Sequence, residues 1–314
     1  MAQPSISVLV LTYHPQKQAL FSTLRSIVLQ KDCNYEVIVA DDGSGDFFEE
    51  EIRAFLDGYG CSYQIVAHQE NQGTVKNIID GLQQANGKYV KPISPGDYLY
   101  DDSTLRDAVS FMEQRNAKAA FGKMVFYYWD GGLQVKNLVH PYLDDIYRTT
   151  PYPYKKAIKQ QVEFNDFISG ASAVYETEAF AQALETISPA VRFAEDAVFQ
   201  LFALKHIPIY AMSRYVVWYE HGSGISTQKT AQSFGRIDTD FYNFYYHMAK
   251  LFPESPYVRR ACALWELRKA GKRGLIKKFR PDKLLFSLRV KLRRKTLHIT
   301  DYKDDFFRQC HGGK

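Results

Sequence analysis

The sequence predicts an α/β protein with a Rossmann-like, mostly parallel central sheet and helices on both faces. Apolar segments of strand length alternate four times with amphipathic segments of helix length, within about the first hundred residues, and this alternation is typical of an open α/β sheet. The first strand segment, SVLVL at residues 7–11, is apolar without interruption, as expected where both faces of a parallel sheet are buried. In the segment after it, Leu20, Leu24 and Ile27 recur at helical spacing.

The elements of this alternating half follow from their periodicity and from the turn residues between them. Strands are expected at residues 7–11, 35–40, 62–67 and 89–93, and helices at 18–29, 48–59, 74–85 and 102–116. The third helix is followed by Asn86-Gly87, a common helix-terminating pair.

The second half of the chain predicts a more mixed arrangement. Asp130-Gly131-Gly132 predicts a hairpin turn, and residues 142–164 predict a polar loop with a short helix. Further strands are expected at 167–175 and 207–219, and helices at 178–187, from 195 onward and from 230 onward.

Polar residues follow three of the predicted parallel strands at the point where each strand ends. Thr12 and Tyr13 follow the first strand, Asp41 and Asp42 close the second, and Asp97 follows the fourth. Ligands of open α/β sheets bind beyond the carboxyl ends of the strands. We therefore expect these residues to line one rim of the sheet.

The stretch Ser94-Pro95-Gly96-Asp97 predicts a tight turn directly after the fourth strand. Proline presets the backbone at the second position of such a turn, and glycine tolerates the positive φ needed at the third. The turn places the carboxylate of Asp97 just past the strand end.

Length and composition limit the class of protein. A chain of 314 residues with 46% hydrophobic residues can bury a large core, in one domain or two fused halves. No stretch approaches the ~20 apolar residues of a membrane-spanning helix, and the apolar run near the N-terminus is too short for a signal-peptide core. The cysteines, at positions 33, 61, 262 and 310, lack metal-ligand spacing and are expected to stay reduced in the cytoplasm.

The positive charge is concentrated near the C-terminus. The net charge is +5, and 13 Lys or Arg residues but only one acid, Asp282, lie in the stretch 268–295, from Arg268 to Lys295. The rest of the chain therefore carries more acids than bases. This asymmetry predicts an acidic catalytic body with a basic tail that meets phosphate groups.

The order of these segments resembles the family 2 glycosyltransferases, which have the GT-A fold. The matching stretches are SVLVLTYHP, YEVIVADDGSGD, ENQGTVKN, GKYVKPISPGDYL, ISGASAVY, FAEDAVF and YEHGSGIS. The resemblance implies an inverting enzyme that moves a sugar from a UDP- or dTDP-sugar to a hydroxyl of a growing cell-surface glycan. It also implies a nucleotide-sugar-binding half at residues 1–115, an acceptor-binding half at 116–228 and a helical basic extension at 229–314.

The resemblance implies that Asp41 and Asp42 bind the base and ribose of the nucleotide. Carboxylates accept hydrogen bonds, and the imide N–H and the ribose hydroxyls donate them; the alternative is a turn with a helix cap. Lys76 is a candidate phosphate contact or part of a solvated helix face. Gly170 and Ala171 are expected close to the donor sugar, although small residues also suit tight packing. The other expected donor-site residues are Thr12, Tyr13, Ser94, Pro95 and Gly96.

The turn at residues 94–97 falls where the resembled family keeps its Asp-x-Asp metal motif, and the first acid of that motif is replaced here. Asp97 matches the last acid, which implies an oxygen ligand for Mg²⁺ or Mn²⁺ at the diphosphate. His221 matches a position that often lies by the diphosphate or the metal. A structural histidine is the alternative.

Glu195-Asp196 matches the family's catalytic acid pair. The resemblance implies that Asp196 is the general base that deprotonates the acceptor hydroxyl, and that Glu195 orients Asp196 or the acceptor. The alternative is a pair of acids that complement the N-terminus of a helix.

The basic tail predicts contact with an anionic membrane surface. Leu284, Leu285, Leu288 and Leu292 cluster on one side of a helical wheel, with basic residues mostly off that side, as in an interfacial helix. We therefore expect a peripheral enzyme at the inner face of the cell membrane with a lipid-diphosphate-linked glycan acceptor. Packing on the chain's own body or on another subunit is the alternative for the helix; nucleic-acid binding is not expected, since no RNA-binding module accompanies the charge.

Three other functions stay open from the sequence. One is a protein or peptide acceptor for the same transfer reaction. The second is a sugar nucleotidyltransferase, although residues 11–18 lack the Gly-rich phosphate loop usual in that class. The third is a catalytically inactive binding protein with the same fold.

Overall fold

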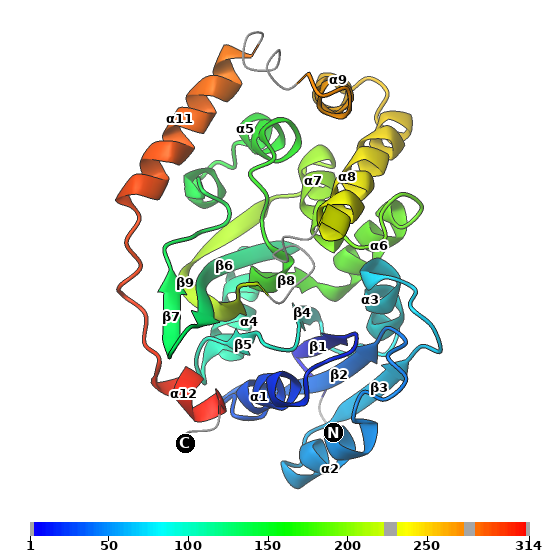
Figure 1. Ribbon diagram of the computed structural model, residues 1–314, viewed down its shortest axis with the longest axis vertical. Helices are drawn as coiled ribbons and strands as arrows, with labels where there is room; N and C mark the ends of the chain where they lie inside the picture. The colour runs from blue at the N-terminus through cyan, green and yellow to red at the C-terminus, as the bar shows by residue number, and fades with distance from the viewer. Residues whose placement is uncertain (1–2, 223–230, 273–279, 312–314) are drawn as a thin grey trace.

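The computed structural model describes residues 3–222, 231–272 and 280–311. Within these residues a nine-stranded mixed sheet forms the centre, with helices on both faces (Figure 1). The strands are β1 Ile6–Thr12, β2 Tyr35–Asp41, β3 Tyr63–Ala67, β4 Tyr89–Ile93, β5 Tyr98–Leu99, β6 Ala119–Trp129, β7 Leu133–Lys136, β8 Ala173–Glu176 and β9 Ile209–Glu220. This confirms the predicted α/β class.

The N-terminal half of the sheet is parallel. β1 pairs in parallel with β2 and β4, and β2 pairs in parallel with β3. β8 joins β4 and β6 in antiparallel orientation, and β6 runs parallel to β9. The sheet order is β3-β2-β1-β4-β8-β6-β9-β5, with β7 paired to β6. The carboxyl ends of β1, β2 and β4 therefore share one rim.

Two apolar cores lie on the two faces of the sheet, because successive side chains of a strand point to opposite faces. Val8 and Val10 of β1 belong to the core that α1, α2 and α4 cover, whereas Leu9 belongs to the core under α3, α6, α7 and α8. The helices are α1 Lys17–Val28, α2 Glu49–Gly58, α3 Thr74–Leu82, α4 Thr104–Arg115, α5 Tyr154–Ile158, α6 Thr177–Ile187, α7 Val198–Leu204, α8 Ala231–Leu251, α9 Pro256–Lys269, α11 Pro281–Thr296 and α12 Asp305–His311.

One predicted strand is shorter than expected. The segment 167–175 was predicted as a strand, but pairing starts only at Ala173. The three residues before it form a short 3-10 helix, η3 (Gly170–Ser172). The small side chains of this segment permit the tight turn. The backbone of this turn contacts Glu195 in the candidate site. The predicted hairpin at residues 130–132 is confirmed between β6 and β7.

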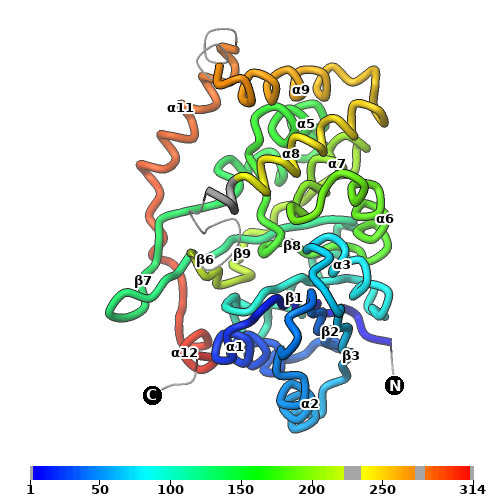
Figure 2. The backbone as a smooth tube through the Cα atoms, turned by 45° about the vertical axis from the view of Figure 1, so that its right-hand side comes forward, coloured from blue at the N-terminus to red at the C-terminus, as the bar shows by residue number. Residues whose placement is uncertain are grey.

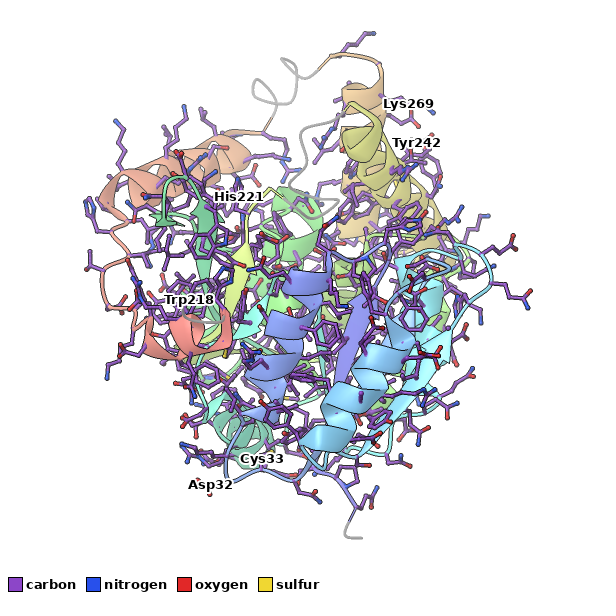
Figure 3. All side chains as sticks on the ribbon, turned by 60° about the horizontal axis from the view of Figure 1, so that its bottom comes forward. Asp32, Cys33, Trp218, His221, Tyr242 and Lys269 are labelled. Atoms are coloured by element: carbon purple, nitrogen blue, oxygen red, sulfur yellow. The ribbon has the colours of Figure 1, made fainter. Side chains whose placement is uncertain are left out.

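The C-terminal extension follows the surface of the body and crosses from one side to the other (Figures 1 and 2). Phe244 and Tyr245 of α8 and Val258 of α9 are fully buried in the core of the body. Lys269 of α9 lies 4.3 Å over the ring of Tyr242 of α8, and Figure 3 shows both side chains on the outer side of this helix pair. The division of the chain into two halves and an extension stays a proposal.

The last two helices contact different parts of the body. α11 runs along the outside of the molecule and then leads through an extended segment to α12, which packs beside α1 (Figures 1 and 2). Phe307 of α12 is buried 4.6 Å from the ring of Trp218, which Figure 3 shows next to that helix. In the described part of the chain, no helix is long and apolar enough to cross a membrane.

Candidate active site

Asp41 organises the loop that follows β2. Its buried carboxylate accepts hydrogen bonds from Thr12 Oγ1 at 2.7 Å, from the Ser44 amide at 2.7 Å and from Ser44 Oγ at 2.5 Å. Gly43, which precedes Ser44, has φ +79°, and a side chain at this position would collide with the backbone of Glu70. The aspartate pair and its glycine thus fix the local backbone at the rim.

Asp42 holds the loop at residues 70–73 against the end of β2. It accepts hydrogen bonds from the amides of Gln72 at 2.7 Å and Gly73 at 3.0 Å, and from Asn71 Nδ2 at 2.8 Å. A carboxylate offers about four lone-pair positions, so the chain's own donors already use most of those of Asp42. The role of Asp41 and Asp42 as nucleotide ligands stays a prediction.

The predicted turn at residues 94–97 is confirmed. The Asp97 amide donates to the Ser94 carbonyl at 3.0 Å, and Gly96 has φ +95°. Two side chains brace the turn from the body. Thr23 Oγ1 accepts from the Gly96 amide at 3.0 Å and donates to the Asp97 carbonyl at 2.7 Å, while Tyr127 donates to the Gly96 carbonyl at 2.5 Å.

A buried lysine lies beneath this turn. Lys91 of β4 is 1% exposed, and its ammonium group donates to the carbonyls of Pro92 and Ala171, each at 2.7 Å. Burial lowers the pKa of Lys91 to about 7 and raises the pKa of the nearby Asp97 to about 7, and the charge of each group offsets part of the shift of the other. Sequence reasoning missed Lys91, although a lysine inside the apolar run 89–93 was a usable signal.

Glu220, at the end of β9, brings a second carboxylate to the Asp97 turn. Its amide donates to Asp97 Oδ1 at 3.0 Å, and a side chain on Gly96 would collide with the Glu220 carboxylate. Mg²⁺ typically uses one or two protein carboxylates together with substrate phosphates. Asp97 and Glu220 fit that donor set, although no group of three or more His, Cys, Asp or Glu residues within 3–222, 231–272 and 280–311 forms a complete metal site.

His221 follows Glu220 and lies at the end of β9 (Figure 3). Its amide donates to the Tyr127 carbonyl at 2.8 Å, and its ring centroid is 6.4 Å from that of Phe126. Glu220, the last residue of β9, is the one that contacts the Asp97 turn. The metal role predicted for His221 stays a prediction.

The acid pair Glu195-Asp196 lies in a short 3-10 helix, η4 (Glu195–Ala197), directly before α7. Both residues are partly exposed, yet the protein packed around their carboxyl groups raises the pKa of both. For Glu195 the negative charge of Asp196 adds to the effect of burial. A carboxylate whose pKa is raised toward neutrality is a better proton acceptor than an ordinary one.

The turn at Gly170–Ser172 connects the acid pair with the Asp97 turn. A side chain on Gly170 would collide with Glu195 Oε1, so glycine allows the carboxylate to approach the backbone. The next residue, Ala171, accepts the hydrogen bond from Lys91. The structure therefore brings four of the predicted site residues into one continuous group: Asp97, Gly170, Ala171 and Glu195.

Asp240 of α8 anchors the loop that carries the acid pair. Its carboxylate is 6% exposed and accepts hydrogen bonds from the amides of Arg192 at 3.1 Å, Phe193 at 2.6 Å and Ala194 at 3.0 Å. Its negative charge also contributes to the raised pKa of Glu195. Nothing in the sequence around Asp240 indicated this contact.

Arg192 joins this loop to the aspartate pair at the rim. Its guanidinium donates to the Asn71 carbonyl at 2.8 Å and to Asn71 Oδ1 at 3.1 Å, and Asn71 in turn donates to Asp42. A continuous set of hydrogen bonds thus runs from Asp42 to Asp240. These hydrogen bonds hold the loop after β2, which carries Asp42, and the loop before Glu195 in fixed positions relative to each other.

Two predicted donor-site residues, Lys76 and Tyr13, lie away from these contacts. Lys76 pairs with Asp80 of its own helix at 2.5 Å, as on a solvated helix face. Tyr13 is 51% exposed and packs against His14. Ser94 belongs to the Asp97 turn through its carbonyl, and its side chain is exposed. Their contacts with a donor, like that of the half-buried Pro95, stay predictions.

The mixed sheet with helices on both faces has the GT-A type of fold. The model of the family Glycosyl transferase family 2 matches residues 7–184, more than half of the chain. The chain belongs to this family.

Individual relatives are distant. An uncharacterized glycosyltransferase of Rickettsia conorii is 28% identical over 111 residues, which are 35% of this chain and 18% of that protein. The crystal structure of Staphylococcus aureus TarS is similar with a TM-score of 0.52 and 16% identity, over 86% of this chain and 54% of that one. The mannosyltransferase PcManGT from Pyrobaculum calidifontis, in complex with GDP-Man and Mn²⁺, has a TM-score of 0.50 and 14% identity, over 93% of this chain and 81% of that one. At these identities the likeness concerns the fold.

Proposed function

We propose that this protein transfers a sugar from a nucleotide sugar to an acceptor hydroxyl with inversion at the anomeric carbon. The observation that carries the proposal is the position of Glu195: its carboxylate packs on Gly170, and the next residue, Ala171, accepts a hydrogen bond from Lys91 on the strand that leads to Asp97. The acid pair can then act on the acceptor hydroxyl while Asp97 acts on the diphosphate of the donor. Family membership supports the reaction class.

Asp196 is the proposed general base. It removes the proton of the acceptor hydroxyl while that oxygen attacks the anomeric carbon from the face opposite the diphosphate. A positioned base contributes about 10²–10⁴-fold to the rate, and the raised pKa of the pair matches the proton affinity that such a base needs near neutral pH. Glu195, held against Gly170, orients Asp196 or the acceptor.

The proposed donor is a UDP-sugar, with a dTDP-sugar as second choice. The Asp41-Asp42 pair at the rim supports a nucleotide whose base and ribose offer hydrogen-bond donors. The mannosyltransferase from Pyrobaculum calidifontis, which has a similar fold, was solved with GDP-Man. This supports a nucleotide-sugar donor but does not support uracil or thymine as its base. Titration with free UDP, dTDP and GDP tests the base, and tighter binding of GDP than of UDP would reject our choice.

Asp97 and Glu220 are the proposed protein ligands of a divalent cation, Mg²⁺ or Mn²⁺. The Mn²⁺ in the mannosyltransferase complex supports this class of cofactor. When bound, such a cation neutralises charge that develops on the leaving diphosphate. Asp97 and Glu220 hold the site at the strand ends, and Thr23 and Tyr127 keep the turn in place.

The proposed acceptor is a growing cell-surface glycan on a lipid-diphosphate carrier at the inner membrane face. The exposed leucines of α11 support membrane attachment: Leu285 is 63% and Leu292 64% exposed, with basic residues on the same helix. If the protein does not bind membranes, a peptide acceptor, or a second copy of the chain packed on α11, is favoured instead.

Hydrolysis and transfer assays with a panel of UDP-, dTDP- and GDP-sugars test the proposal directly. We expect slow hydrolysis of the preferred donor by the unmodified protein and none by Asp196→Asn, with nucleotide binding intact in both. If no donor is cleaved, the chain is a binding protein that keeps the fold. Nucleotide-sugar synthesis from a sugar phosphate would identify a nucleotidyltransferase.

A further inference from the structure

A cavity of about 470 Å³ lies between α11 and the body, away from the acids described above. Its apolar wall includes Val162 of the short π-helix η2 (Lys159–Phe164), Leu264 and Trp265 of α9, and Leu284 and Leu288 of α11. Small-molecule sites typically have volumes of roughly 300–1,000 Å³ and mostly apolar walls. The cavity therefore has the size and lining of a ligand site.

The same cavity carries positive charge. Arg268, Lys283 and Lys291 contribute to its wall. Arg268 pairs with Asp238 through one terminal nitrogen, but its buried Nε has no hydrogen-bond partner within the described residues. Burial, together with the charges of Arg280 and Arg268, lowers the pKa of Lys283.

The acid in the wall is already neutralised. Glu163 has a fully buried side chain that pairs with Arg260 at 2.6 Å and with Arg280. Arg280 also pairs with Asp282 at 2.9 Å. A ligand of this cavity thus meets cations that outnumber the free acids, next to apolar side chains, and the matching chemistry is an anionic group joined to a hydrocarbon chain.

The leucine stripe of α11 connects this cavity to the outside. Leu284 and Leu288 contribute to the cavity wall, whereas Leu285 and Leu292 lie farther round the same helix and are more exposed, at 63% and 64%. On its body side α11 is held by Phe286, which stacks on Phe164 at 4.6 Å. Leu285 and Leu292 are therefore available for contact with the membrane interior, while Leu284 and Leu288 border the cavity.

We propose that the cavity takes one acyl chain of an anionic phospholipid from the membrane on which α11 lies, with the lipid phosphate held by the basic residues of the wall. This inference rests on the proposed membrane attachment and is independent of the transfer reaction. The charge of the stretch 268–295 favours an anionic lipid over a neutral one. The lipid would fix α11 to α9 and to η2.

Tryptophan fluorescence tests the cavity without a membrane. The probe is a single-chain phosphatidylglycerol with a brominated acyl chain, kept below its micelle-forming concentration and added to the full chain. Bromine quenches a tryptophan that it contacts, so we expect quenching of Trp265 in the cavity wall. The Trp265→Phe variant should lose this quenching, and the Trp129→Phe variant, altered at a 45% exposed ring on β6, should keep it.

Filling the cavity gives an independent test. Ser287 lines the cavity from the exposed helix α11, so Ser287→Phe should narrow the space and abolish the quenching of Trp265. The matched control is Leu285→Ser, which changes the outward side of the same helix and should leave the quenching intact. Equal quenching in the unmodified, Trp265→Phe and Ser287→Phe proteins would overturn the proposal.

Vesicle co-sedimentation separates this inference from the attachment on which it rests. Vesicles of phosphatidylcholine with phosphatidylglycerol should bind the protein, and Lys291→Gln should weaken binding about fivefold, because each basic residue near an anionic surface contributes about 1 kcal/mol. Vesicle binding without quenching of Trp265 would reject the cavity site and leave the attachment standing. Quenching by the monomeric lipid without vesicle binding would support the site and reject the attachment.

Discussion

The Lys91 ammonium group on β4 donates a 2.7 Å hydrogen bond to the carbonyl oxygen of Ala171, 80 residues farther along the chain. This contact fixes the turn that supports Glu195 to the strand that leads into Asp97. A buried lysine is costly unless its charge is compensated. Here two carbonyls accept hydrogen bonds from the ammonium group, and the nearby Asp97 offsets part of the cost of burial.

Replacing Lys91 by methionine should destabilise the protein. The substitution leaves the Ala171 carbonyl without its buried donor, and such a loss costs about 1–3 kcal/mol. Chemical denaturation measures the free energy of unfolding. Lys88→Met is the matched control, since Lys88 is exposed and pairs with Glu113 on the surface, so that its loss should cost less than about 1 kcal/mol. Equal stability of both variants would show that Lys91 does not brace the two turns.

Removing Asp240 should lower catalysis more than donor binding. Asp240→Ala takes away the acceptor of three backbone amides in the loop before Glu195, and a displacement of about 1 Å in a catalytic group can cost about 10²-fold in rate. We expect kcat to fall by about that factor with little change in nucleotide affinity. Asp238→Ala, on the same helix but in a surface pair with Arg268, should leave kcat within about twofold, because exposed ion pairs contribute little.

The regular elements were predictable from local sequence. The strand expected at 89–93 is found at the same residues. Those expected at 35–40 and 62–67 differ from the observed strands by one residue at one end, and the one expected at 7–11 differs by one residue at each end. Each is a short, largely apolar run between turn residues, so the local sequence pattern was enough to predict it. The turn at Gly96 was predictable for the same reason, because Pro-Gly restricts the backbone locally.

The supports of the site were not predictable in this way. Lys91, Glu220 and Asp240 act through contacts between segments far apart in the sequence, such as the 48 residues between Asp240 and Arg192. The sequence around Glu220 and Asp240 does not distinguish these residues from an ordinary strand end and an ordinary polar helix position. Lys91 stands out inside an apolar run, but the sequence does not show its partner Ala171. The packing of α8 against the body brings Asp240 to the loop before Glu195, and the position of β9 in the sheet brings Glu220 to the Asp97 turn.

The acid pair predicts how activity and stability depend on pH. The pKa values of Glu195 and Asp196 are raised above their ordinary values near 4, so the transfer rate should rise as pH increases through neutrality, where the base loses its proton. Between the ordinary and the raised pKa values, the folded state binds more protons than the unfolded state. The free energy of unfolding should therefore fall as pH rises through that interval.

Two variants check these signs. Asp196→Asn should flatten part of the fall in stability, as measured by denaturation at a series of pH values. Asp240→Asn removes a negative charge that raises the pKa of Glu195, so the rise in rate should move to lower pH. A pH–rate profile that is unchanged in Asp240→Asn would mean that Glu195 does not contribute to the observed titration.

The Asp97 turn predicts metal binding that depends on two carboxylates. Asp97→Asn and Glu220→Gln should each weaken Mn²⁺ binding in the presence of UDP, because each removes a charged oxygen ligand from a site that has few. Calorimetric titration of Mn²⁺ into the protein with UDP measures the affinity, and loss of Mn²⁺-dependent turnover should follow the same order. Asp101→Asn is the control, since Asp101 pairs with Arg214 beyond the turn and should not change Mn²⁺ affinity.

His221→Gln tests whether the histidine is also a metal ligand. A loss of Mn²⁺ affinity as large as that of Glu220→Gln would give the histidine the ligand role that its sequence position suggested. Full turnover of all these proteins in excess chelator would instead mean that the diphosphate leaves without a metal, and that Asp97 serves the fold through its contact with Glu220.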